Sequence, residues 1–154
     1  MHANIAYLEE PQTYVSAMSG RKAEYWQKAM EEEMESIKKN NTWSLTSLPS
    51  GREAIGCKWV YRLKYNQNGS INKFKARIVA KGYSQIEGID YNETFAPVTS
   101  LATLRVMIAL AASRDLEIHQ MDVKSAYLNG DLKEEIYMKQ PEGFVEEDKE
   151  DLVC

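Results

Sequence analysis

Apolar residues recur at spacings of three and four between residues 22 and 39. One side of a helix would then carry the large apolar side chains: Trp26, Met30, Met34 and Ile37. The other side would carry glutamates and lysines. Asn40-Asn41 follows, and asparagine tolerates the left-handed conformation that often ends a helix. The pattern predicts an amphipathic helix packed on a core.

Residues 58–65 and 73–80 alternate between two kinds of side chain. The positions predicted to share one face are aromatic or aliphatic: Trp59, Tyr61, Leu63, Tyr65, Phe74, Ala76, Ile78 and Ala80. Asn68-Gly69 lies between the two stretches and favours a tight turn, because both residues accept a positive φ. A period of two on both sides of a turn predicts a β-hairpin with one apolar face and one basic face.

The second half predicts a helix at residues 101–113, capped by Thr99 or Ser100 and apolar on most sides, which is typical of a buried helix. Residues 116–123 read as a strand, and residues 135–139 as a short strand. Residues 1–20 read as an irregular lead-in and residues 141–154 as an acidic, loose segment. The fold class expected is therefore α+β.

Net charge alone argues against nucleic-acid binding, since the 154 residues carry a formal charge of −4. The charges are segregated, however. Residues 54–86 contain no acidic residue and seven basic ones, whereas residues 131–151 contain nine acidic and three basic residues. A local positive field can hold phosphates that the net charge would repel.

Other features narrow the class of protein. No apolar run is long enough for a membrane helix, and the N-terminal residues do not resemble a secretory signal, so an intracellular protein is expected. Cys57 and Cys154 form no CxxC pair, and a disulfide between them would be unusual in such a chain.

Asp122 is the candidate for chemistry, because it follows a strand that should be buried. A carboxylate there costs free energy unless it is paired, hydrogen-bonded or bound to a metal. The pattern allows two interpretations. The aspartate either caps the turn that follows or binds a metal ion.

The spacing of Asp122 and Tyr127 resembles motif A of reverse transcriptases, and the wider resemblance is to the copia class of LTR retrotransposons. Six blocks occur in that family's order and spacing, within a match from about residue 13 to residue 154: residues 41–43, 58–60, 74–82, 93–98, 120–130 and 137–144. The resemblance implies an RNA-directed DNA polymerase with a right-hand fold. Residues 21–154 would form a partial domain, with fingers at about 42–98, front palm at about 99–144 and an acidic tail at 145–154.

The resemblance also implies residue roles. Asp122 would be catalytic and would bind Mg²⁺, with the carbonyl oxygen of Val123 in the metal's shell. The residues implied to contact the incoming nucleotide are Ser125 and Ala126 through their amides, Tyr127 beneath the sugar, and Lys73, Lys75 and Arg77 at the triphosphate. For Arg62, Lys64 and Lys81, contact with template phosphates and simple solvation both remain open.

The family's second acidic motif is missing, because no Asp-Asp pair occurs in these residues. We therefore expect no polymerisation by this chain alone, and marginal stability with an incompletely covered 101–113 helix. The implied partners are template-primer, deoxynucleotides and the rest of the polyprotein, without a membrane, in a cytoplasmic virus-like particle of the parent element. Two alternatives are a non-catalytic nucleic-acid-binding module and a non-functional remnant of a decayed element.

Overall fold

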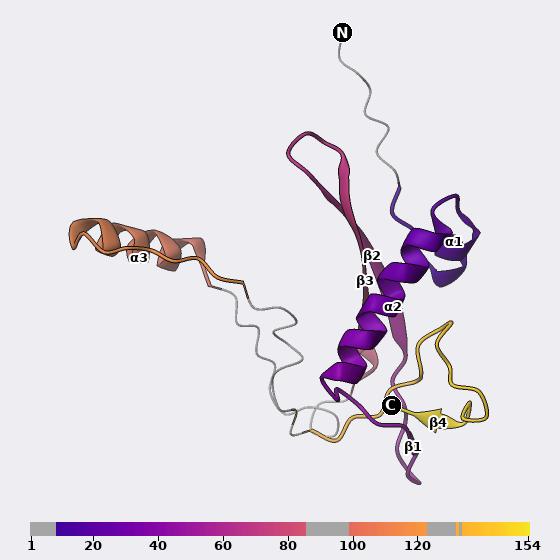
Figure 1. Cartoon of the computed structure of the whole chain (residues 1–154). Coiled ribbons are helices and arrows are strands. Elements are labelled where there is room, and N and C mark those ends of the chain that lie inside the picture. Colours follow the sequence, from indigo (N-terminus) through magenta and orange to yellow (C-terminus); the bar gives the residue numbers. More distant parts are fainter. Residues whose placement is uncertain (1–8, 86–98, 123–131, 133) are drawn as a thin grey trace.

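The computed structural model describes residues 9–85, 99–122, 132 and 134–154 (Figure 1). Its elements are α1 (Tyr14–Ser19), α2 (Ala23–Lys39), β1 (Thr46–Ser47), β2 (Cys57–Tyr65), β3 (Ile71–Ala80), the 3-10 turn η1 (Gly82–Ser84), α3 (Leu101–Ser113) and β4 (Leu152–Val153). The described strands form two antiparallel pairs, β2 with β3 and β1 with β4. This mixture agrees with the expected α+β class. None of the helices in the described part is long and apolar enough to cross a membrane.

Helix α2 confirms the first prediction and begins one residue later than expected, at Ala23. The C-terminal end of α2 shows why Asn40-Asn41 predicts the end of the helix. Asn41 adopts a φ of +48°, and two backbone hydrogen bonds of 3.1 Å close the last turn, from Asn41 N–H to Lys38 O and from Thr42 N–H to Ile37 O. This is a Schellman arrangement, which satisfies carbonyl groups that a helix end would otherwise leave unpaired.

The β2–β3 hairpin also confirms its prediction, with Trp59 opposite Ile78 and Tyr61 opposite Ala76. The turn differs from the expected pair of positive φ angles, because only Gly69 of the Asn-Gly pair has one, at +80°. Asn68 instead accepts hydrogen bonds through its side chain from the N–H and hydroxyl of Ser70, at 3.0 and 2.6 Å. The loop is consequently longer than a two-residue turn.

The core lies between α2 and the apolar face of the hairpin (Figure 1). Trp26 meets the rings of Tyr61 and Phe74 edge-on, at centroid distances of 5.2 and 4.8 Å. Met30 is fully buried, and its sulfur accepts a hydrogen bond of 3.3 Å from the Tyr61 hydroxyl. Burial raises the pKa of Tyr61 to about 12, so this donor keeps its proton at neutral pH.

Helix α1 corrects the expectation of an irregular lead-in. Thr13 and Ser16 form a reciprocal capping box at its start, a signal that the apolar pattern alone does not reveal. Ala17 is the buried residue of this helix and joins the core beside α2. The N-terminal segment therefore contributes to packing.

The acidic C-terminal segment is ordered, contrary to the expected loose tail. β4 pairs with β1, and Met138 exchanges two backbone hydrogen bonds with Cys154, at 2.8 and 2.9 Å. The expected strand at residues 135–139 is reduced to one bridge between Ile55 and Met138. Gln140 explains the order, because its side-chain amide bonds three backbone groups of the segment: Glu146 N–H, Lys149 O and Leu152 O.

Residues 141–144 attach this segment to the hairpin. Pro141 is fully buried, and the Trp59 indole N–H donates to Glu142 O at 2.9 Å. Gly143 has a φ of +82°, and a Cβ there would lie 2.4 Å from the Tyr14 ring. Only glycine fits this approach. Phe144 then packs on Trp59, with ring centroids 5.5 Å apart.

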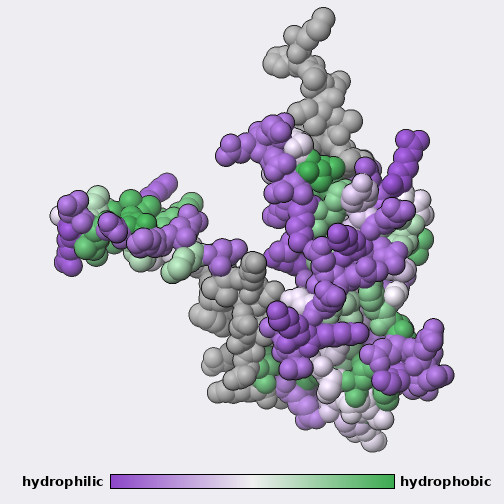
Figure 2. Space-filling model, in the orientation of Figure 1, coloured by the Kyte–Doolittle hydropathy of each residue, from purple (hydrophilic) through white to green (hydrophobic). Residues whose placement is uncertain are grey.

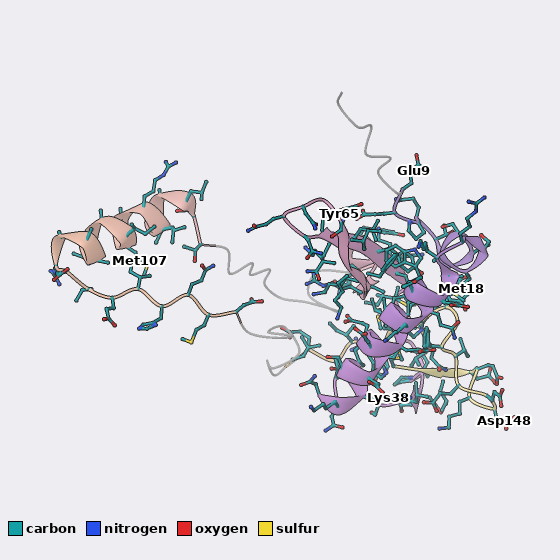
Figure 3. All side chains as sticks on the ribbon, turned by 45° about the horizontal axis from the view of Figure 1, so that its top comes forward. Glu9, Met18, Lys38, Tyr65, Met107 and Asp148 are labelled. Carbon is teal, nitrogen blue, oxygen red and sulfur yellow. The ribbon has the colours of Figure 1, made fainter. Side chains whose placement is uncertain are left out.

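Helix α3 has the predicted bounds, and the Ser100 side chain caps it by accepting from Thr103 N–H at 3.1 Å. The burial that its composition predicts is not found, and the helix is incompletely covered, as also expected. Ala111 is the buried residue of this helix, while Val106 is 67% exposed and Met107 62% exposed. The apolar atoms of α3 are visible in Figure 2, and Figure 3 shows Met107 on the helix. The described part of the chain packs no apolar surface over it.

The predicted strand at residues 116–123 is also wrong over its described part, residues 116–122. These residues follow α3 through a turn in which Leu116 N–H donates to Ala111 O at 2.9 Å, and they then run back alongside the helix (Figure 1). A strand needs a partner ladder, and no described strand pairs with this segment.

Candidate nucleic-acid interface

The side of the hairpin opposite the core carries a cluster of basic residues, which we call the outer face. It is defined by Lys58, Arg62 and Lys64 on β2 and Lys73, Lys75 and Arg77 on β3. The strand register places Arg62 directly opposite Lys75 and Lys64 directly opposite Lys73. Like charges in such cross-strand pairs destabilise a sheet. Folding therefore concentrates positive charge here against its own electrostatic cost.

One corner of the outer face is occupied by Glu10. Its carboxylate accepts from the Arg62 guanidinium and, at 2.8 Å, from Leu63 N–H. These contacts lower the pKa of Glu10, the Leu63 N–H being the largest cause and Arg62 a further one. The N-terminal chain thus lies against β2, where residues 11–12 line a shallow depression with the strand.

Lys75 and Arg77 lie near a carboxylate of α2. Burial raises the pKa of Glu33, and this shift is opposed by the charges of Arg77 and Lys75 and by a hydrogen bond from Ile78 N–H. No ion pair among the described residues involves Lys75 or Arg77. Both cations therefore act on Glu33 through their charge and not through an ion pair among the described residues.

The three predicted triphosphate-binding residues share one side of β3, but their side chains do not all have the same surroundings. The alternation places Lys73, Lys75 and Arg77 on the same side of β3, as predicted. The Lys73 ammonium, however, reaches Glu32 of α2 at 2.7 Å. Of the three, Lys73 is the one whose ammonium is ion-paired within the described part of the chain.

The predicted catalytic centre is represented by Asp122, which is exposed. Within the described ranges, no group of three or more His, Cys, Asp or Glu side chains could hold a metal ion. Asp122 can supply one of the several oxygen ligands that Mg²⁺ takes, so the described residues provide only part of such a site. Val123, Ser125, Ala126 and Tyr127 lie outside the described residues.

Reasoning from sequence missed two carboxylates of this interface, Glu10 and Glu33. Glu10 meets Arg62 from 52 residues away along the chain, and no local pattern signals such a contact. Glu33 is seven residues after Trp26 and three after Met30, so a helical projection puts it on the apolar side of α2, where the hairpin half-buries it. The cysteines play no part here: Cys57 and Cys154 are free, and burial raises the pKa of both thiols.

Comparison with known proteins decides the family. Residues 40–154 match the family model described as reverse transcriptase (RNA-dependent DNA polymerase). The chain belongs to the reverse transcriptase family. This match, together with the transposon polyproteins described next, confirms the predicted kinship with retrotransposon reverse transcriptases. The basic hairpin lies within the matched residues.

Among curated relatives of this reverse transcriptase chain is the retrovirus-related Pol polyprotein from transposon TNT 1-94 of Nicotiana tabacum. It is 47% identical over 94% of the chain and 11% of the relative. The corresponding polyprotein from transposon RE2 of Arabidopsis thaliana is 43% identical over 98% of the chain and 10% of the relative. The chain thus spans about a tenth of these polyproteins.

A shorter relative is an uncharacterised mitochondrial protein of Arabidopsis thaliana. It is 38% identical over 73% of the chain, which covers 63% of that protein. No solved structure matches the chain.

Proposed function

We propose that this chain is part of the RNA-directed DNA polymerase of a copia-type retrotransposon, and that the outer face of its hairpin contacts phosphate groups. The ligand would be the incoming nucleotide or the template-primer. The observation that carries the proposal is the gathering of basic side chains on one face of the hairpin, four of which make no ion pair among the described residues: Lys58, Lys64, Lys75 and Arg77. An anionic ligand would balance that charge.

Lys75 and Arg77 would make the main contacts. Arginine offers a planar fork that can hold two phosphate oxygens, and lysine offers a compact point charge. The two residues are two positions apart on β3, so their side chains leave the strand on the same side. Glu33 lies near both cations and partly balances their charge when no ligand is bound.

Asp122 would serve the chemical step only within a larger assembly. Mg²⁺ in such enzymes supplies electrostatic stabilisation of the reacting phosphate oxygens. Asp122 and the Val123 carbonyl would contribute ligands to it, with Ser125, Ala126 and Tyr127 beside the nucleotide. Further carboxylates are required, and the 154 residues contain no Asp-Asp pair.

Salt-dependent binding tests the outer face. Fluorescence anisotropy would measure the affinity of the chain for a labelled template-primer over a range of salt concentrations. Each phosphate contact contributes a slope of about 0.9 on double-logarithmic axes. We expect the double variant Lys75→Gln/Arg77→Gln to reduce the slope by about 1.8 for two such contacts. The matched variant Lys38→Gln/Lys39→Gln, at the far end of α2, should leave it unchanged. Equal slopes for both variants would reject the proposal.

Primer extension tests the role of Asp122. We expect no extension by the purified chain, because one carboxylate cannot position the metal ions that phosphoryl transfer requires. Extension that the variant Asp122→Asn abolishes would show that the chain is catalytically complete, contrary to this expectation.

A second candidate is a non-catalytic nucleic-acid-binding module. It is favoured by the contrast between the basic outer face, which the described residues form, and the metal site, which they do not form. Both functions predict binding. Only the polymerase predicts that Asp122→Asn abolishes extension in a longer chain that carries the remaining carboxylates.

A further inference from the structure

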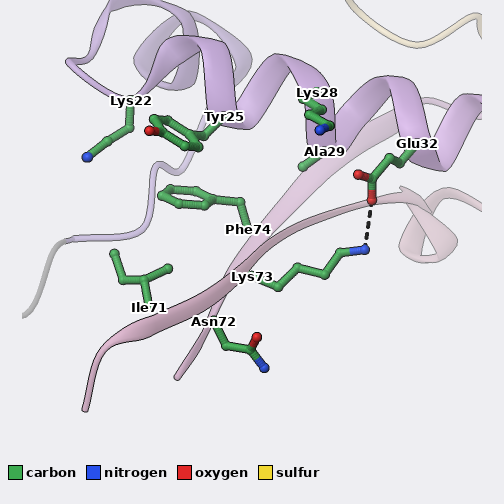
Figure 4. A pocket seen from close by; sticks show the side chains of 9 residues that line it. All are labelled: Lys22, Tyr25, Lys28, Ala29, Glu32, Ile71, Asn72, Lys73 and Phe74. Atoms are coloured by element: carbon green, nitrogen blue, oxygen red, sulfur yellow. Dashed lines mark hydrogen bonds and ion pairs between the residues drawn. The ribbon is translucent and has the colours of Figure 1, made fainter. Parts of the chain in front are cut away.

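A hollow of about 480 Å³ lies between α2 and the start of β3 (Figure 4). Apart from Lys73, the residues that line it do not belong to the outer face. From α2 and its N-cap these are Lys22, Tyr25, Lys28, Ala29 and Glu32, and from β3 they are Ile71, Asn72, Lys73 and Phe74.

The charge of the hollow is positive. Three ammonium groups line it, those of Lys22, Lys28 and Lys73, against the one carboxylate of Glu32. Glu32 is paired with Lys73 at 2.7 Å, as the dashed line in Figure 4 shows. No ion pair within the described part of the chain involves Lys22 or Lys28. The ligand that fits such a lining is an anion.

The hollow also has an aromatic wall. Tyr25 and Phe74 stack with ring centroids 5.0 Å apart and planes 24° apart. Tyr25 is 53% exposed, and the Lys22 ammonium lies 5.0 Å from its ring centroid. Proteins that bind single-stranded nucleic acid combine cations with aromatic rings in this way. The cation contacts a phosphate, and a base or sugar packs on the ring.

Lys73 connects this hollow with the outer face. Its backbone position is opposite Lys64 in the hairpin register, whereas its ammonium belongs to the hollow. Lys73 therefore belongs both to the outer face and to the lining of the hollow. A strand held at the outer face could extend past Lys73 into the hollow, where its phosphate would compete with Glu32 for that lysine.

We propose that the hollow binds a single-stranded segment of nucleic acid, with Lys22 and Lys28 at its phosphates and Tyr25 against a base or sugar. This inference rests on the proposed function, because it assumes that the chain meets nucleic acid at the outer face. It adds a second site with its own residues, on α2 rather than on the hairpin.

The experiment measures the affinity of the full 154-residue chain for a labelled single-stranded RNA dodecamer over a range of salt concentrations. We expect Lys22→Gln/Lys28→Gln to reduce the double-logarithmic slope by about 1.4, which is two contacts at about 0.7 each on single strands. Tyr25→Leu keeps an apolar cover over Phe74 and should weaken binding without changing the slope. Lys38→Gln/Lys39→Gln is the charge-matched control, and thermal melting confirms that each variant is folded.

Three outcomes separate the possibilities. Loss of slope in Lys22→Gln/Lys28→Gln beyond the control supports the inference. The same slope in Lys22→Gln/Lys28→Gln and in the control overturns the inference. In that case, a reduced slope for Lys75→Gln/Arg77→Gln on template-primer would still support the proposed function. Unchanged RNA binding, together with loss of polyglutamate binding in Lys22→Gln/Lys28→Gln, would assign the hollow to an acidic protein segment and also overturn the inference.

Discussion

The hairpin with α2 and the helix α3 carry equally clear apolar patterns, yet they differ in burial. Trp59 and Tyr61 of β2 are 5% and 3% exposed, whereas Leu101 and Val106 of α3 are 70% and 67% exposed. A helix forms locally, through good helix-forming residues and a cap such as Ser100. Burial needs a second apolar surface. The hairpin receives one from α2, and the described residues supply none to α3.

The same contrast divides the functional residues. Lys75 and Arg77 project from a strand whose other face is fixed by Trp26 and the rest of the core. Asp122 belongs to the exposed segment that follows α3. A preorganised site needs side chains on rigid elements, which holds for Lys75 and Arg77 on β3 and not for Asp122, which lies outside any helix or strand.

The largest expected effect comes from the core of the hairpin. Trp59→Ala should destabilise the chain by about 3–5 kcal/mol, because it removes a large buried ring and leaves a cavity. Ile108→Ala in α3 should change stability by no more than about 0.5 kcal/mol, since that side chain is exposed. Urea unfolding followed by tryptophan fluorescence or circular dichroism measures both. Equal losses would break the comparison between the two regions.

Gly143 tests how the C-terminal segment is attached to the hairpin. Gly143→Ala combines an unfavourable positive φ with a clash against the Tyr14 ring, and Gly51→Ala has a similar φ of +80° in open space. Gly51→Ala is the control and should destabilise the chain by about 1–2 kcal/mol through backbone strain alone. The Gly143 variant should cost more, measured by thermal unfolding. Indistinguishable melting temperatures would mean that residues 141–144 do not pack on Tyr14.

Glu10→Gln is expected to have a smaller effect, of about 1 kcal/mol near neutral pH, because it weakens one partly exposed ion pair with Arg62. The pKa of Glu10 is lowered in the folded chain. Its contribution is therefore present above the unfolded-state pKa and is lost as the pH falls through the folded-state value. Urea unfolding at neutral and acidic pH should show the difference between wild type and variant shrinking in acid. A constant difference would assign the effect to packing instead.

The smallest expected effect on stability concerns the surface of α3. Leu104 and Ile108 are one helical turn apart, and both are about half exposed. Leu104→Gln/Ile108→Gln should leave the unfolding of the hairpin unchanged while reducing self-association of the chain, because an exposed apolar face promotes aggregation. Light scattering during a concentration series measures this. Unaltered scattering with a lower melting temperature would show that α3 is packed.

The sequence predicts those parts of the fold that depend on local periodicity. Helix α2, its asparagine stop, the two arms of the hairpin and the division of its faces all follow from spacings within a few residues. The alternation likewise predicts Lys75 and Arg77 as neighbours on the outer face. These are the features for which local preference and tertiary packing agree.

The remaining features depend on contacts between distant residues. Gln140 orders an acidic segment through three hydrogen bonds to backbone groups. The Lys73 ammonium pairs with Glu32 of α2, although it was expected to act together with Lys75 and Arg77. Neither contact leaves a periodic signal. The burial expected for α3 was wrong for a related reason, since composition reports how apolar a helix is and not whether a partner surface covers it.

Hydrogen exchange measured by mass spectrometry, with and without template-primer, compares the protection of the hairpin with that of α3 and locates the contact with nucleic acid. We expect slow exchange of α2, β2 and β3 in the free chain, fast exchange of α3, and further slowing on the hairpin when nucleic acid binds. The contradicting result would be α3 as protected as α2 in the free chain, with protection by nucleic acid appearing at residues 101–122 and not on the hairpin.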